Sequence, residues 1–206
     1  GGGKTTVLDL MLGLHDPTSG KITIDGIDLL EIDLSSWRKR VGVVEQDLFL
    51  LNASVLENLQ FGRNEIAKCK IDEVAKLTGA HHFIMELKDG YDTLIGDRGH
   101  VLSGGQRQRL ALCRALLREP EILVLDEAMN ALDSSAEKVM QRAVREMQGQ
   151  RTIFLVAHRL MSLRSADWLV ILEDGRVVDQ GPCKELLESS RYFRLSAESS
   201  ANRSED

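Results

Sequence analysis

The sequence has little of what marks secreted, membrane-spanning or nucleic-acid-binding proteins. Its three cysteines (Cys69, Cys113 and Cys183) are odd in number and widely spaced, which argues against a disulfide framework and favours a reducing, cytosolic setting. No apolar run approaches the roughly 18 residues of a membrane-spanning helix, and the first residues lack the regions of a secretion signal. The net charge of -6 comes from interspersed acidic and basic residues, so we predict no nucleic-acid partner and no polybasic membrane anchor. Trp37 and Trp168 are expected to be packing residues rather than base-stacking platforms.

The 206 residues are 43% hydrophobic, which is enough for the core of one domain or of a domain with an inserted lobe. Apolar runs at 41–44, 122–125 and 152–157 predict short strands, the last two of them buried. Apolar residues at helical spacing predict helices at 106–118 and 136–147. The order of strands and helices indicates an α/β fold with a parallel sheet and right-handed crossovers.

Other segments predict smaller elements around this sheet. A helix is expected at 5–14, and Asp-Gly turns predict antiparallel hairpins within 21–29 and 169–178. From about residue 54 to about residue 87 the pattern becomes helical. One face of that segment comprises Ile71, Val74, Ala75 and Thr78. These elements predict a small antiparallel β part and a helical insert.

The first six residues resemble half of a phosphate-binding loop. They match the second half of G-x-x-x-x-G-K-[ST], whose first glycine would fall three residues before residue 1, so we expect the rest of the loop to precede this chain. Backbone N–H groups at a helix start favour anions, Lys4 can reach the β- and γ-phosphates, and Thr5 can ligate Mg²⁺. Taken alone, the run is equally typical of a linker or cloning scar. The candidate phosphate-binding residues are Gly1, Gly2, Gly3, Lys4, Thr5 and Thr6.

Two adjacent carboxylates end the apolar run at 122–125. α/β proteins bind ligands at the carboxyl edge of their sheet, where Asp126 and Glu127 would lie. Successive strand residues point in opposite directions, so the two acids can have separate roles. Asp126 can hold Mg²⁺ through a water, and Glu127 can orient or deprotonate an attacking water. The simpler alternative is a strand that ends in solvated charge.

The run LSGGQ is the most specific motif in the chain. It resembles the signature motif of ABC ATPases, which in that family clamps the γ-phosphate of ATP held by a second subunit. Ser103 and Gln106 also have the spacing of a capping box at a helix start, and the two interpretations are compatible. The resemblance implies a RecA-like P-loop NTPase core, a helical insert that carries the signature, and an ATP site shared by two nucleotide-binding domains. The signature residues are Leu102, Ser103, Gly104, Gly105 and Gln106.

Further elements follow in the order that the ABC family has. Gln46, after a predicted strand, resembles the Q-loop glutamine, which in the family ligates Mg²⁺ and links the ATP site to the membrane partner. Asp133 resembles the D-loop aspartate, although it could equally cap the following helix. His158 resembles the H-loop histidine, so the resemblance implies ATP and Mg²⁺ as cofactors and Glu127 and His158 as catalytic residues. The implied Mg²⁺ ligands are Thr5, Gln46 and Asp126.

The segment Thr93–Gly99 resembles the X-loop of ABC exporters, with Asp97 in place of a glutamate. The stretch at 52–58 and the run that begins at His158 also resemble the exporter group. This implies that the chain contacts transmembrane domains, fused or separate, through Gln46 and Thr93–Gly99 on the cytoplasmic side of a membrane. Two such domains, identical or different, would close around ATP and power the export of a solute.

Two alternatives predict other features. A soluble ABC ATPase of DNA repair or translation would have a coiled-coil insertion, a second cassette or a basic face, and none of these is visible in the sequence. A degenerate cassette that does not hydrolyse ATP would have lost Glu127, His158 or part of the signature, and all of these residues are present.

The resemblance covers nearly the whole chain and predicts its layout. We expect an ATPase domain at 1–190, with an ATP-binding core at about 1–50 and 119–190 and a helical subdomain at about 51–118. The polar segment 191–206 is expected to be a disordered tail. The strands and the adenine-stacking aromatic residue that precede the phosphate loop in the family are expected to lie outside this chain.

Overall fold

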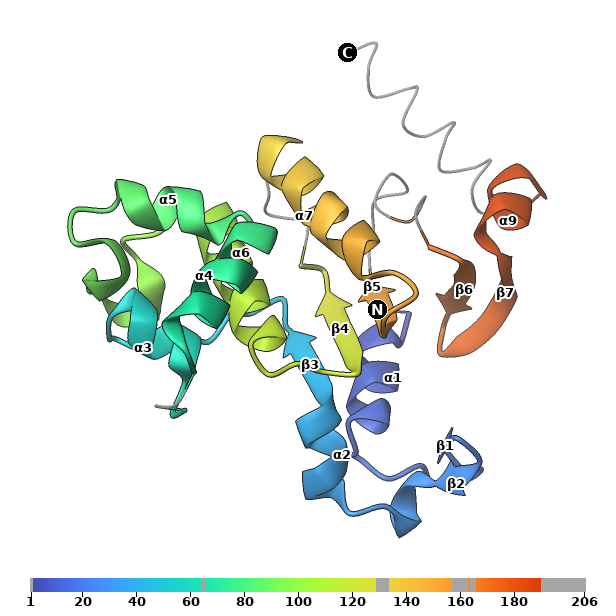
Figure 1. Cartoon of the computed structure of the whole chain (residues 1–206). Coiled ribbons are helices and arrows are strands. Elements are labelled where there is room, and N and C mark those ends of the chain that lie inside the picture. Colours follow the sequence, from blue (N-terminus) through green and yellow to red (C-terminus); the bar gives the residue numbers. More distant parts are fainter. Residues whose placement is uncertain (1, 64–65, 129–133, 157–162, 164–165, 190–206) are drawn as a thin grey trace.

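The structure is a computed structural model that describes residues 2–63, 66–128, 134–156, 163 and 166–189 (Figure 1). The part of the chain so described contains a three-stranded parallel sheet, two antiparallel hairpins and a group of helices beside the sheet. The predicted α/β class, with a parallel sheet, a small antiparallel part and a helical insert, is confirmed. Within the same ranges, no helix is both long and apolar enough to span a membrane.

The parallel sheet has the order β3–β4–β5, with β4 in the middle. Its strands are β3 (Val41–Val44), β4 (Ile122–Asp126) and β5 (Thr152–Val156). Pairing sets Val44 beside Leu125, and Asp126 beside Val156. Because all three strands run in the same direction, their carboxyl ends meet at one edge of the sheet.

Helices cover both faces of the sheet around β4. They are α1 (Lys4–Met11), α2 (Leu34–Arg40), α6 (Gly104–Leu116) and α7 (Ser134–Met147). Leu123 and Leu125 pack in one cluster with α6 and α7, whereas Val124 packs in a second cluster with α1 and α2. These three side chains are at most 1% exposed. The alternation of strand side chains therefore places two helices on each face.

The helix predicted at 5–14 ends earlier, at Met11. Gly13 has a φ of 62°, and its N–H donates to the carbonyl oxygen of Leu10. The N–H of Leu14 donates to the carbonyl oxygen of Asp9 at 2.9 Å. This is a Schellman arrangement, and its left-handed glycine stops the helix.

The strand predicted at 152–157 is present as β5, which is described to Val156, but the prediction that it is buried is wrong. Thr152 is exposed, and Phe154 is 37% exposed. In the described ranges β5 pairs with β4 alone, so it is an edge strand with one face only partly covered. A run of apolar residues does not distinguish such an edge from a strand that is buried on both sides.

The helical insert contains three short helices that pack on α6. They are α3 (Val55–Gln60), α4 (Lys68–Leu77) and α5 (Ala80–Glu86). The predicted apolar face of α4 is confirmed, since Ile71, Val74, Ala75 and the following Thr78 are all buried. Two 3₁₀ turns, η2 (Gly90–Asp92) and η3 (Asp97–Gly99), lead from α5 to α6.

Both predicted hairpins are present. Their strands are β1 (Thr23–Ile24), β2 (Ile27–Asp28), β6 (Trp168–Glu173) and β7 (Arg176–Pro182), and η1 (Leu29–Glu31) and α9 (Cys183–Ser189) follow them. Both Asp-Gly pairs have positive φ at each residue, as a type I′ turn requires. Trp37 is buried and donates to the carbonyl oxygen of Met11 at 2.8 Å, but Trp168 is 57% exposed, so the prediction of a packing role is wrong for Trp168.

Candidate functional site

The glycine run leads directly into α1. Gly3 is the N-cap with φ 86° and ψ 9°, and no side chain caps the helix start. A Cβ atom on Gly2 would lie 2.7 Å from the carbonyl oxygen of Leu172, in β6. Thr5 and Thr6 are exposed on the first turn. This helix start therefore offers N–H groups and exposed hydroxyls, and it follows a backbone that passes too close to β6 for a side chain at Gly2.

The acid pair lies where β4 ends. Asp126 is the last residue of the strand, and the N–H of Glu127 donates to the carbonyl oxygen of Val156 at 3.0 Å. Glu127 has a φ of 50°, a left-handed conformation that typically costs about 1–3 kcal/mol for a residue other than glycine. The chain thus turns sharply after Asp126, and both side chains are partly buried.

Gln46 lies at the same edge of the sheet, two residues past the end of β3, and is exposed. The parallel order of the strands therefore brings Gln46 and the acid pair to one edge, as predicted. Gly1, Asp133 and His158 lie outside the described residues. The described residues hold no group of three or more His, Cys, Asp or Glu side chains arranged to bind a metal ion.

The signature run forms the start of α6. The Ser103 N–H donates to Gln106 Oε1 at 2.8 Å, and the Gln106 N–H donates to Ser103 Oγ at 3.2 Å. The predicted capping box is therefore confirmed, and it places the first helical residue at Gly104 rather than Gln106. Leu102 is 2% exposed and anchors the motif, whereas Ser103 is exposed.

The segment Thr93–Gly99 is held against the start of α3. The Val55 N–H donates to the Thr93 carbonyl oxygen at 3.0 Å, and the Ile95 N–H donates to the Ala53 carbonyl oxygen at 3.1 Å. Ile95 is fully buried, but Leu94 is 68% exposed. The segment thus presents an apolar side chain outward from a fixed backbone.

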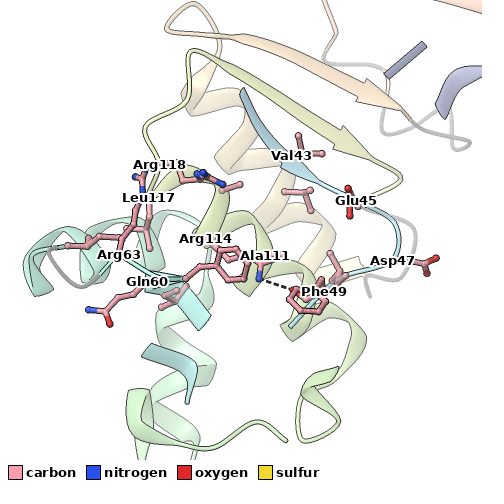
Figure 2. A pocket seen from close by; sticks show the side chains of 16 residues that line it. Val43, Glu45, Asp47, Phe49, Gln60, Arg63, Ala111, Arg114, Leu117 and Arg118 are labelled. Atoms are coloured by element: carbon pink, nitrogen blue, oxygen red, sulfur yellow. Dashed lines mark hydrogen bonds between the residues drawn. The ribbon is translucent and has the colours of Figure 1, made fainter. Parts of the chain in front are cut away.

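A cavity of about 210 Å³, which we term the groove, lies between the end of β3, the end of α3 and α6 (Figure 2). Five charged residues line it: Glu45, Asp47, Arg63, Arg114 and Arg118. Phe49 and Phe61 also line it and are 60% and 44% exposed. No motif in the sequence predicted this groove, which contains two of the five phenylalanines in the chain.

Comparison with known proteins places these features in a family. The family model for ABC transporters matches residues 1–130. The chain is 45% identical over 203 residues to the heterocyst differentiation ATP-binding protein HepA of Nostoc sp., covering 97% of this chain and 33% of that protein. It is 44% identical over 187 residues to the alpha-hemolysin translocation ATP-binding protein HlyB of Escherichia coli, covering 91% of this chain and 26% of that protein.

A solved structure is also similar. It is that of a bacterial Atm1-family ABC exporter with ATP bound, with a TM-score of 0.91 and 35% identity over 97% of this chain and 35% of that chain. The chain spans between about a quarter and a third of the length of the proteins it matches here. The resemblance to ATPases of exporters, rather than to soluble ABC proteins, is confirmed. The chain belongs to the ABC transporter family.

Proposed function

We propose that this chain is the ATPase domain of an ABC exporter, in which ATP hydrolysis powers the movement of a solute through transmembrane domains. The observation that carries this proposal is the intact signature, which begins α6 in a capping box and leaves Ser103 exposed. Similarity to an exporter solved with ATP bound supports it. The chain would then work on the cytoplasmic side of the membrane.

The phosphates of ATP would bind at the start of α1. The uncapped N–H groups after Gly3 favour an anion, and Lys4 adds a positive charge that can reach the β- and γ-phosphates. The close approach of Gly2 to Leu172 supports a built loop rather than a linker. We assign Gly1 and Thr6 to the same loop.

The oxygen donors at the sheet edge suit Mg²⁺, which prefers hydroxyl, amide and carboxylate oxygens. Thr5, Gln46 and Asp126 would hold it, Asp126 through a water. When bound, the ion would neutralise charge on the phosphate oxygens. The three proposed ligands come from three segments, so binding of Mg²⁺ would link α1 to the ends of β3 and β4.

Glu127 would act as the general base on the attacking water. Its left-handed backbone and its hydrogen bond to Val156 fix the position from which the Glu127 side chain projects at the sheet edge. We propose that His158, two residues beyond the end of β5, contacts the γ-phosphate and the Glu127 carboxylate. Both roles follow from the family resemblance.

We infer that the ATP site is completed by a second copy or by a related domain. Ser103 and the N–H groups of Gly104 and Gly105 would clamp the γ-phosphate held by the partner. Ser103 is exposed and the two glycines are only half-buried on this chain, which supports that role. Asp133 would lie at the same dimer contact.

The groove and the segment Thr93–Gly99 would contact the transmembrane domains. Exposed Phe49, Phe61 and Leu94 offer apolar anchors, and the groove begins beside Gln46. This arrangement would connect the membrane partner to the Mg²⁺ site.

The proposed layout is an ATPase domain at 1–190. Its ATP-binding core would comprise about 1–50 and 119–190, and its helical subdomain about 51–118. The arrangement of α3 to α5 around α6 supports the helical subdomain, and α6 also packs on β3. The segment 191–206 lies outside the described residues and is assigned as a tail by composition.

The test is ATP hydrolysis by the whole protein that contains this chain, purified and reconstituted in liposomes. We expect Mg²⁺-dependent hydrolysis that is abolished in Glu127→Gln. Hydrolysis that requires added DNA or ribosomes, and that is unchanged by reconstitution, would favour the soluble alternative.

A further inference from the structure

Arg114 contacts two residues, Phe49 and Phe61, that lie more than 50 positions before it in the sequence. It lies on α6, and its Nη1 donates to the carbonyl oxygen of Phe49 at 2.8 Å, the dashed line in Figure 2. Its guanidinium carbon lies 5.0 Å from the ring centroid of Phe61, at the end of α3. One side chain therefore joins α6, α3 and the segment that follows β3.

Phe49 and Phe61 both line the groove and contact each other. Their ring centroids are 6.4 Å apart at an interplanar angle of 82°, an edge-to-face contact. Phe61 is the C-cap of α3 with a φ of 41°, a conformation that is strained for an aromatic residue. Phe49 is 60% exposed and Phe61 is 44% exposed, so both residues remain accessible from solvent. The strain is maintained by the surrounding contacts, of which Arg114 is one.

The Arg114 guanidinium is partly withdrawn from water. Desolvation by burial lowers its pKa, and the carboxylate of Glu45 acts in the opposite direction. A charged group in such a place makes stronger hydrogen bonds and cation–π contacts than one on the open surface. Displacement of Phe49 would therefore alter the hydrogen bond of the guanidinium, and displacement of Phe61 would alter its cation–π contact.

Arg114 is also aligned with the signature. Residue 114 follows residue 103 by eleven positions, which is roughly three helical turns, so Arg114 and Ser103 lie along the same side of α6 about 16 Å apart. Phe49 is three positions after Gln46. Arg114 therefore lies between the groove, the Gln46 segment of this chain's proposed ATP site and the signature that would act on the partner's ATP.

We propose that Arg114 is a positioning residue, which holds the segment from Glu45 to Leu51 at a fixed position against α6. A partner that binds in the groove would then move the Gln46 segment and the signature together. This inference rests on the proposed function for its consequence in transport, but the link itself is a property of this chain. Loss of the link should free the segment without unfolding α6.

The test compares Arg114→Met with Arg114→Lys in the whole protein. The methionine keeps apolar bulk but removes the charge and the N–H donors, whereas lysine keeps the charge and the donors of a single nitrogen but lacks the planar guanidinium. Arg118→Met is the matched control, because Arg118 also lines the groove but is exposed. The first measurement is hydrogen exchange of the amides at 45–51 and 104–116.

We expect exchange at 45–51 to be at least tenfold faster in Arg114→Met, with exchange at 104–116 unchanged, partial recovery in Arg114→Lys and no change in Arg118→Met. Equal exchange at 45–51 in Arg114→Met and the wild type would overturn the link. Faster exchange throughout α6 would instead show a purely structural role and would overturn it as well.

The second measurement is steady-state hydrolysis in liposomes. For Arg114→Met we expect kcat to fall at least fivefold while the KM for ATP stays within twofold, and Arg114→Lys to recover at least half of kcat. A rise in KM with unchanged kcat would contradict a positioning role. Absence of hydrolysis in the wild type would count against the proposed function, whereas the exchange measurement would still decide the link.

Discussion

The N–H of Glu127 donates a hydrogen bond to the carbonyl oxygen of Val156 at 3.0 Å, and this bond joins the residue after β4 to the last residue of β5. The bond fixes Glu127 in a left-handed conformation at the sheet edge. A carboxylate that must orient one water needs such a fixed backbone.

Glu127→Gln should leave ATP binding intact and reduce turnover by at least about a hundredfold, since general base catalysis typically contributes 10²–10⁴-fold. The variant should also trap a dimer with ATP bound. Glu31→Gln, which removes an exposed carboxylate from η1, is the control and should keep normal turnover. The measurement is steady-state hydrolysis together with size-exclusion chromatography in ATP. Near-normal turnover in Glu127→Gln would remove this residue from the catalytic role.

Ser103→Ala should separate the capping role from the signature role. Loss of either capping serine should cost about 1 kcal/mol of stability. Ser54→Ala is the matched control, because Ser54 forms an equivalent capping box at the start of α3. We expect similar losses in thermal stability for both variants, but a loss of hydrolysis for Ser103→Ala alone. Equal hydrolysis in the two variants would leave Ser103 with capping as its only function.

Gly3→Ala should weaken ATP binding about tenfold, because an alanine at a φ of 86° costs roughly 1–2 kcal/mol and displaces the start of α1. Gly20→Ala imposes similar backbone strain at a φ of 77°, in open space away from the loop. The affinity of the control for ATP, measured by calorimetry, should stay within twofold of the wild type. If both variants bound ATP with equal affinity, the assignment of Gly3 to the ATP-binding loop would be contradicted.

Asn58→Leu should lower the free energy of unfolding by about 2–4 kcal/mol, because buried backbone groups lose their partners. Asn58 is fully buried, accepts from the Leu51 N–H at 2.8 Å and donates to the carbonyl oxygens of Leu51 and Ser54. Asn52→Leu changes an exposed asparagine in the same stretch and should cost little. Urea unfolding followed by circular dichroism measures both, and equal midpoints would contradict the bonding role.

The sequence predicted those elements that are determined by the spacing of neighbouring residues. The bounds of β3 follow from a short run of apolar residues and glycine, all but Val43 buried, and the start of α6 follows from the spacing of Ser103 and Gln106. The acid pair and Gln46 share an edge because parallel strands carry their ends to the same side. The bounds of β3 and the start of α6 do not depend on a contact between distant segments, whereas the shared edge requires only that β3 and β4 pair in parallel.

Features that depend on such contacts could not be predicted. The exposure of Phe154 and Trp168 depends on which strands lie beside them, and a run of apolar residues does not encode that neighbourhood. The groove exists because Arg114 meets Phe49 and Phe61 across large sequence separations. The left-handed turn at Glu127 also follows from pairing of β4 with β5, not from the residue itself.

The central claim, an ATP site completed by a second subunit, is tested most directly, for two identical chains, by mixing two inactive variants. Ser103→Arg should block the partner's site, and Glu127→Gln should block the site on its own chain. In a mixed dimer one site would then keep both intact residues. We expect purified mixed dimers to hydrolyse ATP at up to about half of the wild-type rate, because one of their two sites is intact. No recovery in dimers verified to be mixed, although each variant binds ATP, would contradict a site built from both chains.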